Sequence, residues 1–376
     1  MLWPEIKVII SGGGTGGHIF PAISIANALM ELNSRNKILF VGAQGRMEME
    51  KVPAAGYEII GLKIKGIRRK LSLENFKLPF LLISSLFKSA KVIKRFSPDV
   101  AVGVGGYASG PLLFMAGLKN VPSLIQEQNS YAGITNRLLA KRASKICVAY
   151  DGMNKYFPQE KIVLTGNPVR KQIREMSMDK ASARASFGLD PDRKTLLVIG
   201  GSLGAASINK SVLAGLNKLS EKGIQLIWQT GKSGAYFIDK AGNPNEIKRH
   251  ISPFIERMDL AFAASDFIIS RAGAGSISEL QIAGKPVILV PSPNVAEDHQ
   301  TKNAMALVEM NAALLVKDSE AEMVLIDKAI SVSESEALCR SLSENIKSLA
   351  IFDSDLRIAK EVYRLAGVIE GSVSKN

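Results

Sequence analysis

The sequence predicts an α/β protein made of two doubly wound domains, each built on a parallel sheet. The chain has 376 residues, more than the roughly 250 to 300 at which one hydrophobic core usually stops growing, so two domains are expected. Short apolar runs alternate with longer amphipathic stretches, which is the pattern of parallel strands joined by helices. This series occurs twice along the chain, although we find no repeat of the sequence itself.

Each apolar run predicts one strand. Residues 6–10, 38–41, 100–104, 123–126 and 146–149 predict strands of the first domain, and residues 195–199, 225–229, 267–270, 287–290 and 313–316 predict strands of the second. Between the two series Gly and Pro break the periodicity at residues 165–170, where we expect the hinge. We therefore expect domains of residues 1–166 and 167–351, with a last helix at about 352–368 joined to the first. The polar tail after it is expected to fray.

Composition narrows the class of protein. Apolar residues make up 46% and charged residues 22%, which is ordinary for a globular protein and unlike a disordered or fibrous one. The net charge of +13 favours an anionic partner. Cys147 and Cys339 form no CxxC pair, so neither a disulfide framework nor structural zinc is expected, and a reducing cytoplasm fits. We expect no signal peptide. The chain has no uninterrupted run of roughly 18 apolar residues, the length needed to span a bilayer, so we expect no membrane-spanning segment.

The first strand leads into a turn in which five of the six residues from Gly12 to Gly17 are glycine. Glycines let backbone N–H groups approach an anion or a sugar, and the helix that we expect to open near Pro21 adds the positive end of its dipole. The turn satisfies GxGxxG, which alone is a weak signal. A dinucleotide-binding dehydrogenase would also have an acidic residue after the second strand, where this chain has Gln44, so NAD is not expected.

Two further glycine-rich loops, at residues 200–204 and 271–276, follow strands of the second domain and precede expected helices. Their amides and the Ser202 hydroxyl could hold a diphosphate without a metal, because a helix N-terminus supplies partial positive charge. Glu279 lies three residues beyond Ser276. Its carboxylate could accept hydrogen bonds from both hydroxyls of a ribose, or it could close a capping box with Ser276 as N-cap. The residues alone leave both interpretations open.

Six short motifs occur in a fixed order. They are Gly-Gly-Thr-Gly-Gly-His18 with Phe20-Pro21, Gly103-Val-Gly-Gly-Tyr107-Ala-Ser-Gly-Pro111, Glu127-Gln-Asn129, Gly166-Asn-Pro-Val-Arg170, Gly200-Gly-Ser-Leu-Gly-Ala205 and Ser270-Arg-Ala-Gly-Ala-Gly-Ser-Ile-Ser-Glu279. Together they cover nearly the whole chain, and they resemble the MurG family, the UDP-N-acetylglucosamine (UDP-GlcNAc) transferases of glycosyltransferase family 28. The resemblance implies a GT-B fold, in which two Rossmann-like domains face each other across a cleft. It also implies transfer of GlcNAc to lipid I, giving lipid II in peptidoglycan synthesis.

The resemblance also assigns roles to particular residues, with the donor held mostly by the C-terminal half. Backbone near Phe254 and Ile255 would read the uracil, Glu279 would bind the ribose hydroxyls, and Gln300 would contact the sugar. The diphosphate would face Ser202, Ala274, Gly275 and Ser276, with Arg170 adding charge from the side. Thr15, Gly16, Gly17, Tyr107 and Asn129 would line the acceptor and sugar side of the cleft.

The implied reaction is inverting, with the 4-hydroxyl of the muramoyl sugar attacking the anomeric carbon of GlcNAc as UDP departs. A base near that hydroxyl would assist. His18 is the candidate, because it lies in a glycine-rich turn and histidine titrates near neutral pH; a ligand-binding or turn-stabilising role is the alternative. Glu127 is the rival base, or it orders the loop at residues 103–110 through a hydrogen bond.

No cofactor is expected. The Asp-x-Asp sequences at residues 190–192 and 353–355 precede a strand and a helix, so neither has the position of a metal site at a strand end. The charge on the leaving group would then be met by helix dipoles and by Arg170.

A basic and apolar stretch lies between residues 61 and 95, with ten Lys or Arg against the single acid Glu74. Such a stretch suits an anionic bilayer. We expect the membrane patch to contain Lys63, Lys65, Arg68, Arg69, Lys70, Phe76 and Phe80. The alternative is a solvated basic face with Leu and Phe in the core. Nucleic acid is not expected, because no aromatic stacking platform is evident. Together with the resemblance, this stretch implies a peripheral protein on the cytoplasmic face of the bacterial inner membrane; other cell-wall synthesis proteins are further partners by resemblance only.

Other functions fit the same motifs. They are a related transferase with another lipid acceptor, a UDP-GlcNAc epimerase of similar fold, and a sensor that binds the nucleotide sugar without turnover. An epimerase would need further carboxylates in the cleft, and the spacing offers no obvious set. Loss of catalysis would be expected to disturb His18 or Glu279, and both are present.

Overall fold

The computed structural model describes residues 3–64, 78–241 and 247–368. The chain divides into two compact units. Unit 1 comprises Met1–Val169 together with Asp353–Asn376, and unit 2 comprises Arg170–Phe352. The end of the chain therefore returns to the first unit. In the part of the chain that the structure describes, no helix is long and apolar enough to cross a membrane.

Unit 1 is a parallel α/β unit. Its strands are β1 (Lys7–Ser11), β2 (Lys37–Ala43), β3 (Glu58–Leu62), β4 (Val100–Gly103), β5 (Ser123–Glu127), β6 (Lys145–Val148) and β7 (Ile162–Leu164). Its helices are α1 (Gly16–Leu32), α2 (Glu48–Ala54), α3 (Leu78–Phe96), α4 (Ser109–Leu118), α5 (Ile134–Leu139) and α16 (Ser354–Leu365), with one-turn helices η2 (Met153–Lys155) and η3 (Gln159–Lys161). Within the described ranges the strand order is β3-β2-β1-β4-β5-β6-β7, and each pair is parallel.

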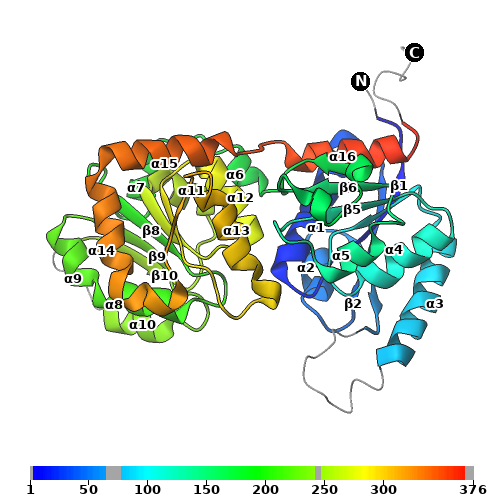
Figure 1. Ribbon diagram of the computed structural model, residues 1–376, viewed down its shortest axis with the longest axis horizontal. Helices are drawn as coiled ribbons and strands as arrows, with labels where there is room; N and C mark the ends of the chain where they lie inside the picture. Colours follow the sequence, from blue (N-terminus) through cyan, green and yellow to red (C-terminus); the bar gives the residue numbers. More distant parts are fainter. Residues whose placement is uncertain (1–2, 65–77, 242–246, 369–376) are drawn as a thin grey trace. The chain divides into compact units, whose positions relative to one another are not determined.

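The core of unit 1 has two layers, one on each face of the sheet. Alternate strand residues point to opposite faces, so Val8 and Ile10 join the layer under α1 and α16, whereas Ile9 joins the layer under α3, α4 and α5. The last helix, red in Figure 1, packs against α1. Its buried Tyr363 hydroxyl accepts from Asn36 Nδ2 at 2.8 Å and donates to the Pro4 carbonyl at 3.2 Å. These bonds fix the last helix to the segments that precede β1 and β2.

Unit 2 repeats this architecture. Its strands are β8 (Thr195–Ile199), β9 (Gln225–Gln229), β10 (Arg249–Ser252), β11 (Phe267–Ser270), β12 (Val287–Leu289) and β13 (Leu314–Leu315). Its helices are α6 (Lys171–Arg174), α7 (Lys180–Ser186), α8 (Ala206–Ala214), α9 (Leu216–Glu221), α10 (Ala235–Ala241), α11 (Met258–Ala264), α12 (Ala274–Ala283), α13 (His299–Val308), α14 (Ala321–Glu334) and α15 (Glu336–Ser348), with η4 (Ala296–Asp298) and η5 (Asp318–Glu320). Among described residues the strand order is β10-β9-β8-β11-β12-β13, again all parallel.

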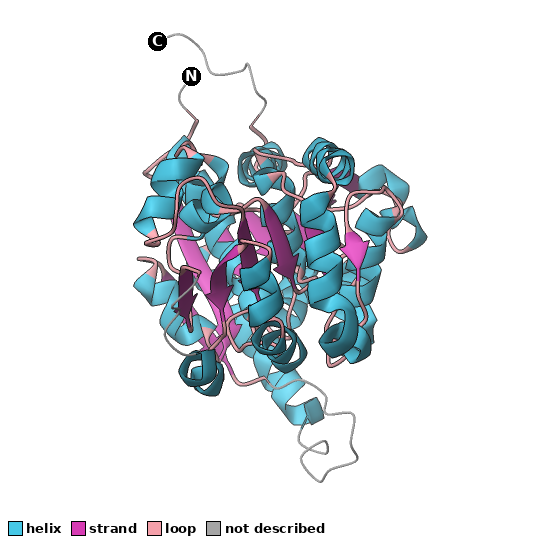
Figure 2. Ribbon diagram, turned by 90° about the vertical axis from the view of Figure 1, so that its left-hand side faces the viewer, coloured by secondary structure: helices cyan, strands magenta, loops and turns pink. Residues whose placement is uncertain are grey.

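Helices cover both faces of the sheet in unit 2, as Figure 2 shows with strands in magenta. On one face Leu196, Val198 and Trp228 pack with residues of α8 and α14. Trp228 is fully buried, and its Nε1–H donates to Asn209 Oδ1 on α8 at 3.0 Å. The burial of a large aromatic ring with its one polar group paired fixes α8 against the sheet.

The strands expected from apolar runs are all present, three of them with the predicted bounds: β8, β9 and β11. The structure adds β3, β7 and β10, which the sequence did not predict. These three lie at the sheet edges, where the strand residues are half exposed and the apolar run is broken. An edge strand pairs on one side only and has less need of a continuous apolar run.

Candidate active site

In each unit the two glycine-rich loops follow adjacent strands at the point where the strand order reverses. In unit 1 the reversal is between β1 and β4, and Ser11 lies beside Gly103 in register. In unit 2 it is between β8 and β11, and Ile199 lies beside Ser270. The loops leave the carboxyl ends of these strands, which is the general position of ligand sites in open α/β sheets. Each unit therefore has one candidate ligand site of its own, which we call its half-site.

In unit 1 the loops pack backbone against backbone. Gly105 and Gly106 have φ of +92° and +86°. A Cβ on Gly106 would lie 2.3 Å from the Gly13 carbonyl oxygen. Only glycine allows this approach together with this backbone conformation. The turn at residues 12–17 is thus held by the loop that follows β4.

The turn continues into α1 earlier than expected. The sequence prediction opened the helix near Pro21, and this is wrong: α1 begins at Gly16, with extended Thr15 as N-cap. The Thr15 carbonyl already accepts from His18 N at 3.1 Å and Ile19 N at 3.2 Å. Pro21 lies inside the helix and has no N–H to donate to the Gly17 carbonyl. The helix tolerates this loss within its second turn.

His18 is half buried in the first turn of α1. Its Nδ1 lies 3.1 Å from Thr15 Oγ1. A Cβ on Gly105 would lie 2.9 Å from His18 Nε2, so the glycine makes room for the ring. If Nδ1 carries the proton and donates it to Thr15, Nε2 is the acceptor; this tautomer is assigned from the contact. Thr15, Gly16 and Gly17, predicted to line the site, lie at the same helix start.

Glu48 completes this turn and was not predicted. Its side chain is fully buried. Oε2 accepts from Gly14 N at 3.0 Å, and Oε1 accepts from Ala43 N at 2.9 Å. A Cβ on Gly13 would lie 2.1 Å from Oε1, so a residue other than glycine would displace the carboxylate. Glu48 ties the end of β2 to the glycine turn. No sequence signal marks it, because the glycines that make room for it are remote in sequence.

Glu127, the rival base, is a buried loop anchor. Oε1 accepts from Asn129 N at 3.0 Å and from Asn129 Nδ2 at 3.3 Å, while Oε2 accepts from Gly133 N at 3.0 Å and Asn136 Nδ2 at 2.8 Å. Burial raises the pKa of the Glu127 carboxyl, and these hydrogen bonds oppose the rise. Asn129 is therefore held in place by Glu127.

The loop at residues 103–110 is held by a hydrogen bond from Gln128, the residue after Glu127. One alternative was that Glu127 orders this loop, but the hydrogen bonds of Glu127 given above run to residues 129–136. Gln128 Nε2 donates to the Val104 carbonyl at 2.8 Å. Asn167 Nδ2 in turn donates to the Gln128 carbonyl at 3.0 Å. Neither amide was singled out in advance, since buried Gln and Asn show their partners only in the folded chain.

In unit 2 the loop at residues 200–204 rests on the turn after β9. Gly204 has φ of +91°, and a Cβ there would lie 2.4 Å from the Thr230 carbonyl oxygen. Ser202 is exposed, and its carbonyl accepts from Lys232 N at 3.1 Å. The loop leads into α8, whose N-cap is Ala205. The expected glycine loop before a helix is confirmed.

The second loop leads into α12, which begins at Ala274 with Gly273 as N-cap. The capping-box interpretation of Glu279 is therefore wrong, because Ser276 lies within the first turn and is not the N-cap. Gly273 occupies the cap position with an extended backbone and makes no side-chain cap bond. Glycine is one of the residues that the N-cap position accepts. Ala274, Gly275 and Ser276 form the first turn, where backbone N–H groups lack helical partners.

Glu279 pairs with Arg170. Arg170 Nε donates to Oε1 and Nη2 donates to Oε2, both at 2.8 Å. The guanidinium is partly exposed and the carboxylate is mostly buried. Burial lowers the pKa of Arg170, but the hydrogen bond and charge of Glu279, with the charge of Asp259, outweigh it and raise that pKa. The two residues predicted to bind different parts of the donor thus form a bidentate ion pair, which we call the Arg170–Glu279 fork.

Ile255 and Gln300, expected near the uracil and the sugar, also have partners in unit 2. Ile255 N donates to Gln229 Oε1 at 3.0 Å. A uracil bound at this residue would therefore contact the Ile255 carbonyl, or it would compete with Gln229 for the Ile255 N–H. Gln300, in the first turn of α13, accepts from Ser292 N through Oε1 at 2.8 Å.

The remaining predicted residues lie in unit 1. Tyr107 and Phe80 are exposed, at 49% and 76%. Lys63 is exposed after β3. Lys65, Arg68, Arg69, Lys70 and Phe76 lie outside the described residues.

Within the described ranges no group of three or more His, Cys, Asp or Glu could hold a metal ion. Of the Asp-x-Asp residues, Asp190 pairs with Arg193 and Asp353 with Arg357.

Two domain profiles match the sequence. Residues 8–148 match the N-terminal domain of glycosyltransferase family 28, and residues 195–354 match its C-terminal domain. The chain belongs to glycosyltransferase family 28. It is therefore a glycosyltransferase, and the predicted fold class of two Rossmann-like domains is confirmed by the sheets of both units.

Other members of family 28 match over nearly the full length. A protein of Phocaeicola vulgatus is 56% identical over 366 residues, covering 96% of this chain and 97% of that protein. One from Cytophaga hutchinsonii is 53% identical over 359 residues, covering 96% of each. Both are named UDP-N-acetylglucosamine–N-acetylmuramyl-(pentapeptide) pyrophosphoryl-undecaprenol N-acetylglucosamine transferase.

Solved structures show the same fold. The crystal structure of Acinetobacter baumannii MurG matches with a TM-score of 0.78 at 27% identity, covering 96% of this chain and all of that one. A UDP-N-acetylglucosamine 2-epimerase matches with a TM-score of 0.64 at 12% identity, covering 97% of each chain. The second likeness concerns the fold alone, so it does not favour the epimerase alternative.

Proposed function

We propose that this enzyme transfers N-acetylglucosamine from UDP-GlcNAc to the 4-hydroxyl of the muramoyl sugar of lipid I, giving lipid II. The observation that carries the proposal is 56% identity over 96% of the chain to a relative named for that transfer. The two half-sites support it, because each places glycine loops at a strand-order reversal. Unit 2 is proposed to hold the donor and unit 1 the acceptor.

The acceptor half-site supplies a base. With its Nδ1 proton donated to Thr15, His18 presents Nε2 as the acceptor for the proton of the attacking hydroxyl. The hydroxyl oxygen forms a bond to C1 of GlcNAc while the bond from C1 to the β-phosphate oxygen breaks, and UDP leaves with the electron pair. We assign Glu127 a positioning role, because both of its oxygens already accept hydrogen bonds from the loop that carries Asn129.

The donor half-site receives the departing charge. The first turns of α8 and α12 offer backbone N–H groups and the positive ends of two helix dipoles, and the Ser202 hydroxyl lies in the loop before α8. These groups are fixed before the reaction, so they stabilise the diphosphate without reorganisation. Glu279 is proposed to bind the ribose. A carboxylate has about four lone-pair sites, so it can accept two bonds from Arg170 and two from the ribose hydroxyls.

Helix α3 supports docking to an anionic membrane. Phe80, Ile83 and Phe87 follow the i, i+3, i+7 spacing of one helix face, and they are 76%, 51% and 75% exposed. Lys91, Lys94 and Arg95 are exposed on the same helix. An exposed apolar stripe with basic neighbours suits partial insertion among anionic lipids. We infer a peripheral position on the cytoplasmic face of the cell membrane, where the lipid acceptor would be reached.

Turnover of labelled UDP-GlcNAc, with and without a short-chain lipid I analogue, tests the proposal. Release of UDP that requires the analogue, together with a labelled disaccharide-lipid product, is the expected result. Release of UDP without an acceptor would instead indicate epimerase or hydrolase chemistry. Donor binding with no release under either condition would indicate a sensor.

A further inference from the structure

A pocket lies in unit 2, at the amino ends of the strands and so away from the glycine loops. Its volume is about 270 Å³. The lining residues are Leu216, Asn217, Leu219, Ser220, Ile224, Leu226, Ile247 and Arg249. They come from α9 and from the amino ends of β9 and β10. The glycine loops follow the carboxyl ends of β8 and β11, so this pocket is separate from the proposed donor half-site.

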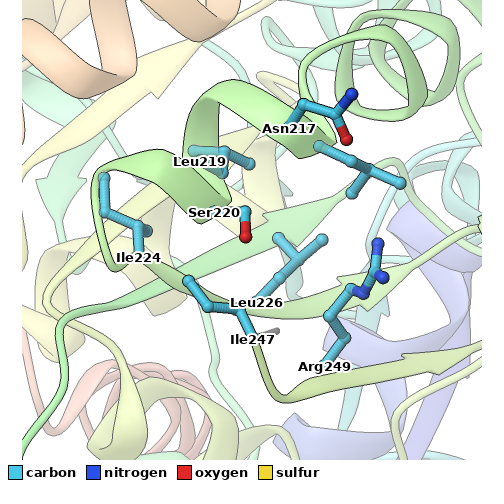
Figure 3. A pocket seen from close by; sticks show the side chains of 8 residues that line it. Asn217, Leu219, Ser220, Ile224, Leu226, Ile247 and Arg249 are labelled. Carbon is cyan, nitrogen blue, oxygen red and sulfur yellow. The ribbon is translucent and has the colours of Figure 1, made fainter. Parts of the chain in front are cut away.

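Most of the wall is aliphatic, and Arg249 is the charged residue in it. Figure 3 shows its side chain extending from β10 toward α9. Arg249 lies beside Leu226 in the register of β10 and β9, which brings the guanidinium next to the aliphatic wall. The arrangement combines an apolar surface with one cation at its side.

The Arg249 side chain has a buried donor without a partner. Among the described residues its Nε is buried and has no hydrogen-bond acceptor. Burial lowers the pKa of Arg249. A buried donor without an acceptor is costly, and native structures rarely retain one unless water, an ion or a ligand satisfies it.

We propose that this pocket binds a small amphiphilic carboxylate, with its head group on Arg249 and its aliphatic chain along Leu219, Ile224, Leu226 and Ile247. A carboxylate can bond side-on to Nε and Nη2, which gives the buried Nε its missing acceptor. The chain excludes water from the aliphatic wall, and each buried methylene strengthens binding roughly fourfold. The pocket lies just below the range of about 300 to 1,000 Å³ typical of small-molecule sites, so the ligand is short.

Calorimetric titration of the full chain with octanoate, below its micelle concentration, tests the proposal. We expect saturable binding that Arg249→Gln weakens roughly tenfold or more, because a hydrogen-bonded charge is lost. The control is Lys248→Gln, which removes one positive charge from the exposed residue just before Arg249. This variant is expected to bind octanoate as the wild type does. Equal loss in both variants, or in neither, would overturn the assignment.

Three further ligands separate the head group from the chain. Octanol has the chain without the anion, acetate has the anion without the chain, and octyl phosphate has a different anion. Octanoate is expected to bind most tightly. Binding of octanol as tight as that of octanoate would remove the role of Arg249, and tighter binding of octyl phosphate would contradict a carboxylate site.

Arg249→Met distinguishes a ligand site from a structural arginine. Without ligand, the melting temperature of this variant is expected to equal or exceed that of the wild type. The buried Nε–H makes no hydrogen bond, so its removal breaks none and relieves the cost of burying it. Octanoate is expected to raise the melting temperature of the wild type alone. A marked drop in the variant without ligand would show Arg249 to be structural and would end the proposal. These measurements need no turnover, so they are independent of the transferase proposal.

Discussion

At the scale of single residues, the contact of His18 with Thr15 supports the proposed proton transfer. His18→Ala is expected to lower kcat roughly a hundredfold or more, the usual range for loss of a general base. The affinity for UDP should be unchanged, because the proposed donor contacts are in unit 2. Steady-state kinetics across pH, with UDP binding by calorimetry, check this. A variant with normal kcat and weakened UDP binding would assign His18 to the ligand instead.

Glu48 is expected to position the glycine turn of unit 1. Glu48→Gln replaces one acceptor oxygen by an NH₂ group facing a backbone N–H, so a buried donor loses its partner, at a cost of about 1–3 kcal/mol of unfolding free energy. We expect kcat to fall while KM for UDP-GlcNAc is retained. Denaturant unfolding and kinetics measure the two effects. Glu50→Gln, exposed on the same helix, is the matched control. If stability falls while kcat does not, Glu48 is structural only.

The Arg170–Glu279 fork can be resolved by charge-conserving substitution. Glu279→Ala is expected to weaken donor binding roughly tenfold or more, because hydrogen bonds to a charged group are lost. Arg170→Lys keeps the charge but cannot form the fork. If Arg170 orients Glu279, this variant should lose nearly as much donor affinity as Arg170→Gln. Calorimetry with UDP decides, with Lys171→Gln as the exposed control. Wild-type affinity in Arg170→Lys would favour direct contact with the diphosphate.

At the scale of elements, α3 carries the membrane prediction. Phe80→Ser with Phe87→Ser removes two exposed rings that bury little in the folded unit, so stability should change little. Binding to vesicles containing phosphatidylglycerol should fall severalfold. Neutralising Lys63, Lys65, Arg68, Arg69 and Lys70 should lower it further and reduce its salt dependence, since each basic residue contributes about 1 kcal/mol. Sedimentation with vesicles measures both. Met323→Ser, at an exposed apolar residue of unit 2, is the control.

The elements also show how far sequence patterns extend. The apolar runs of β8, β9 and β11 are buried throughout, so they predicted those strands with the observed bounds. β3 and β10 are half-exposed edge strands, and their mixed composition left them undetected. The first helix was expected to open near Pro21, but α1 begins about one turn earlier, where the Thr15 carbonyl accepts its first hydrogen bonds.

At the scale of the whole molecule, donor binding should be confined to one unit and should need no metal ion. With EDTA present, UDP is expected to slow amide hydrogen exchange at residues 200–204 and 273–276, because helix N-termini hold the diphosphate. Exchange at residues 12–17 in unit 1 should change little. Mass spectrometry with and without UDP measures both. Protection that appears only when Mg²⁺ is restored would contradict the metal-free expectation.

The sequence by itself determined the fold class, the glycine loops and the family, because apolar periodicity and glycine-rich motifs are local properties of the chain. Tertiary structure alone decided which groups meet. Glu48 reaches Gly14, Arg170 reaches Glu279 across more than a hundred residues, and Arg249 faces an aliphatic pocket. The physical reason is that strand order sets which strand ends and flanking loops are neighbours, and this order arises from packing of the whole sheet rather than from any one segment.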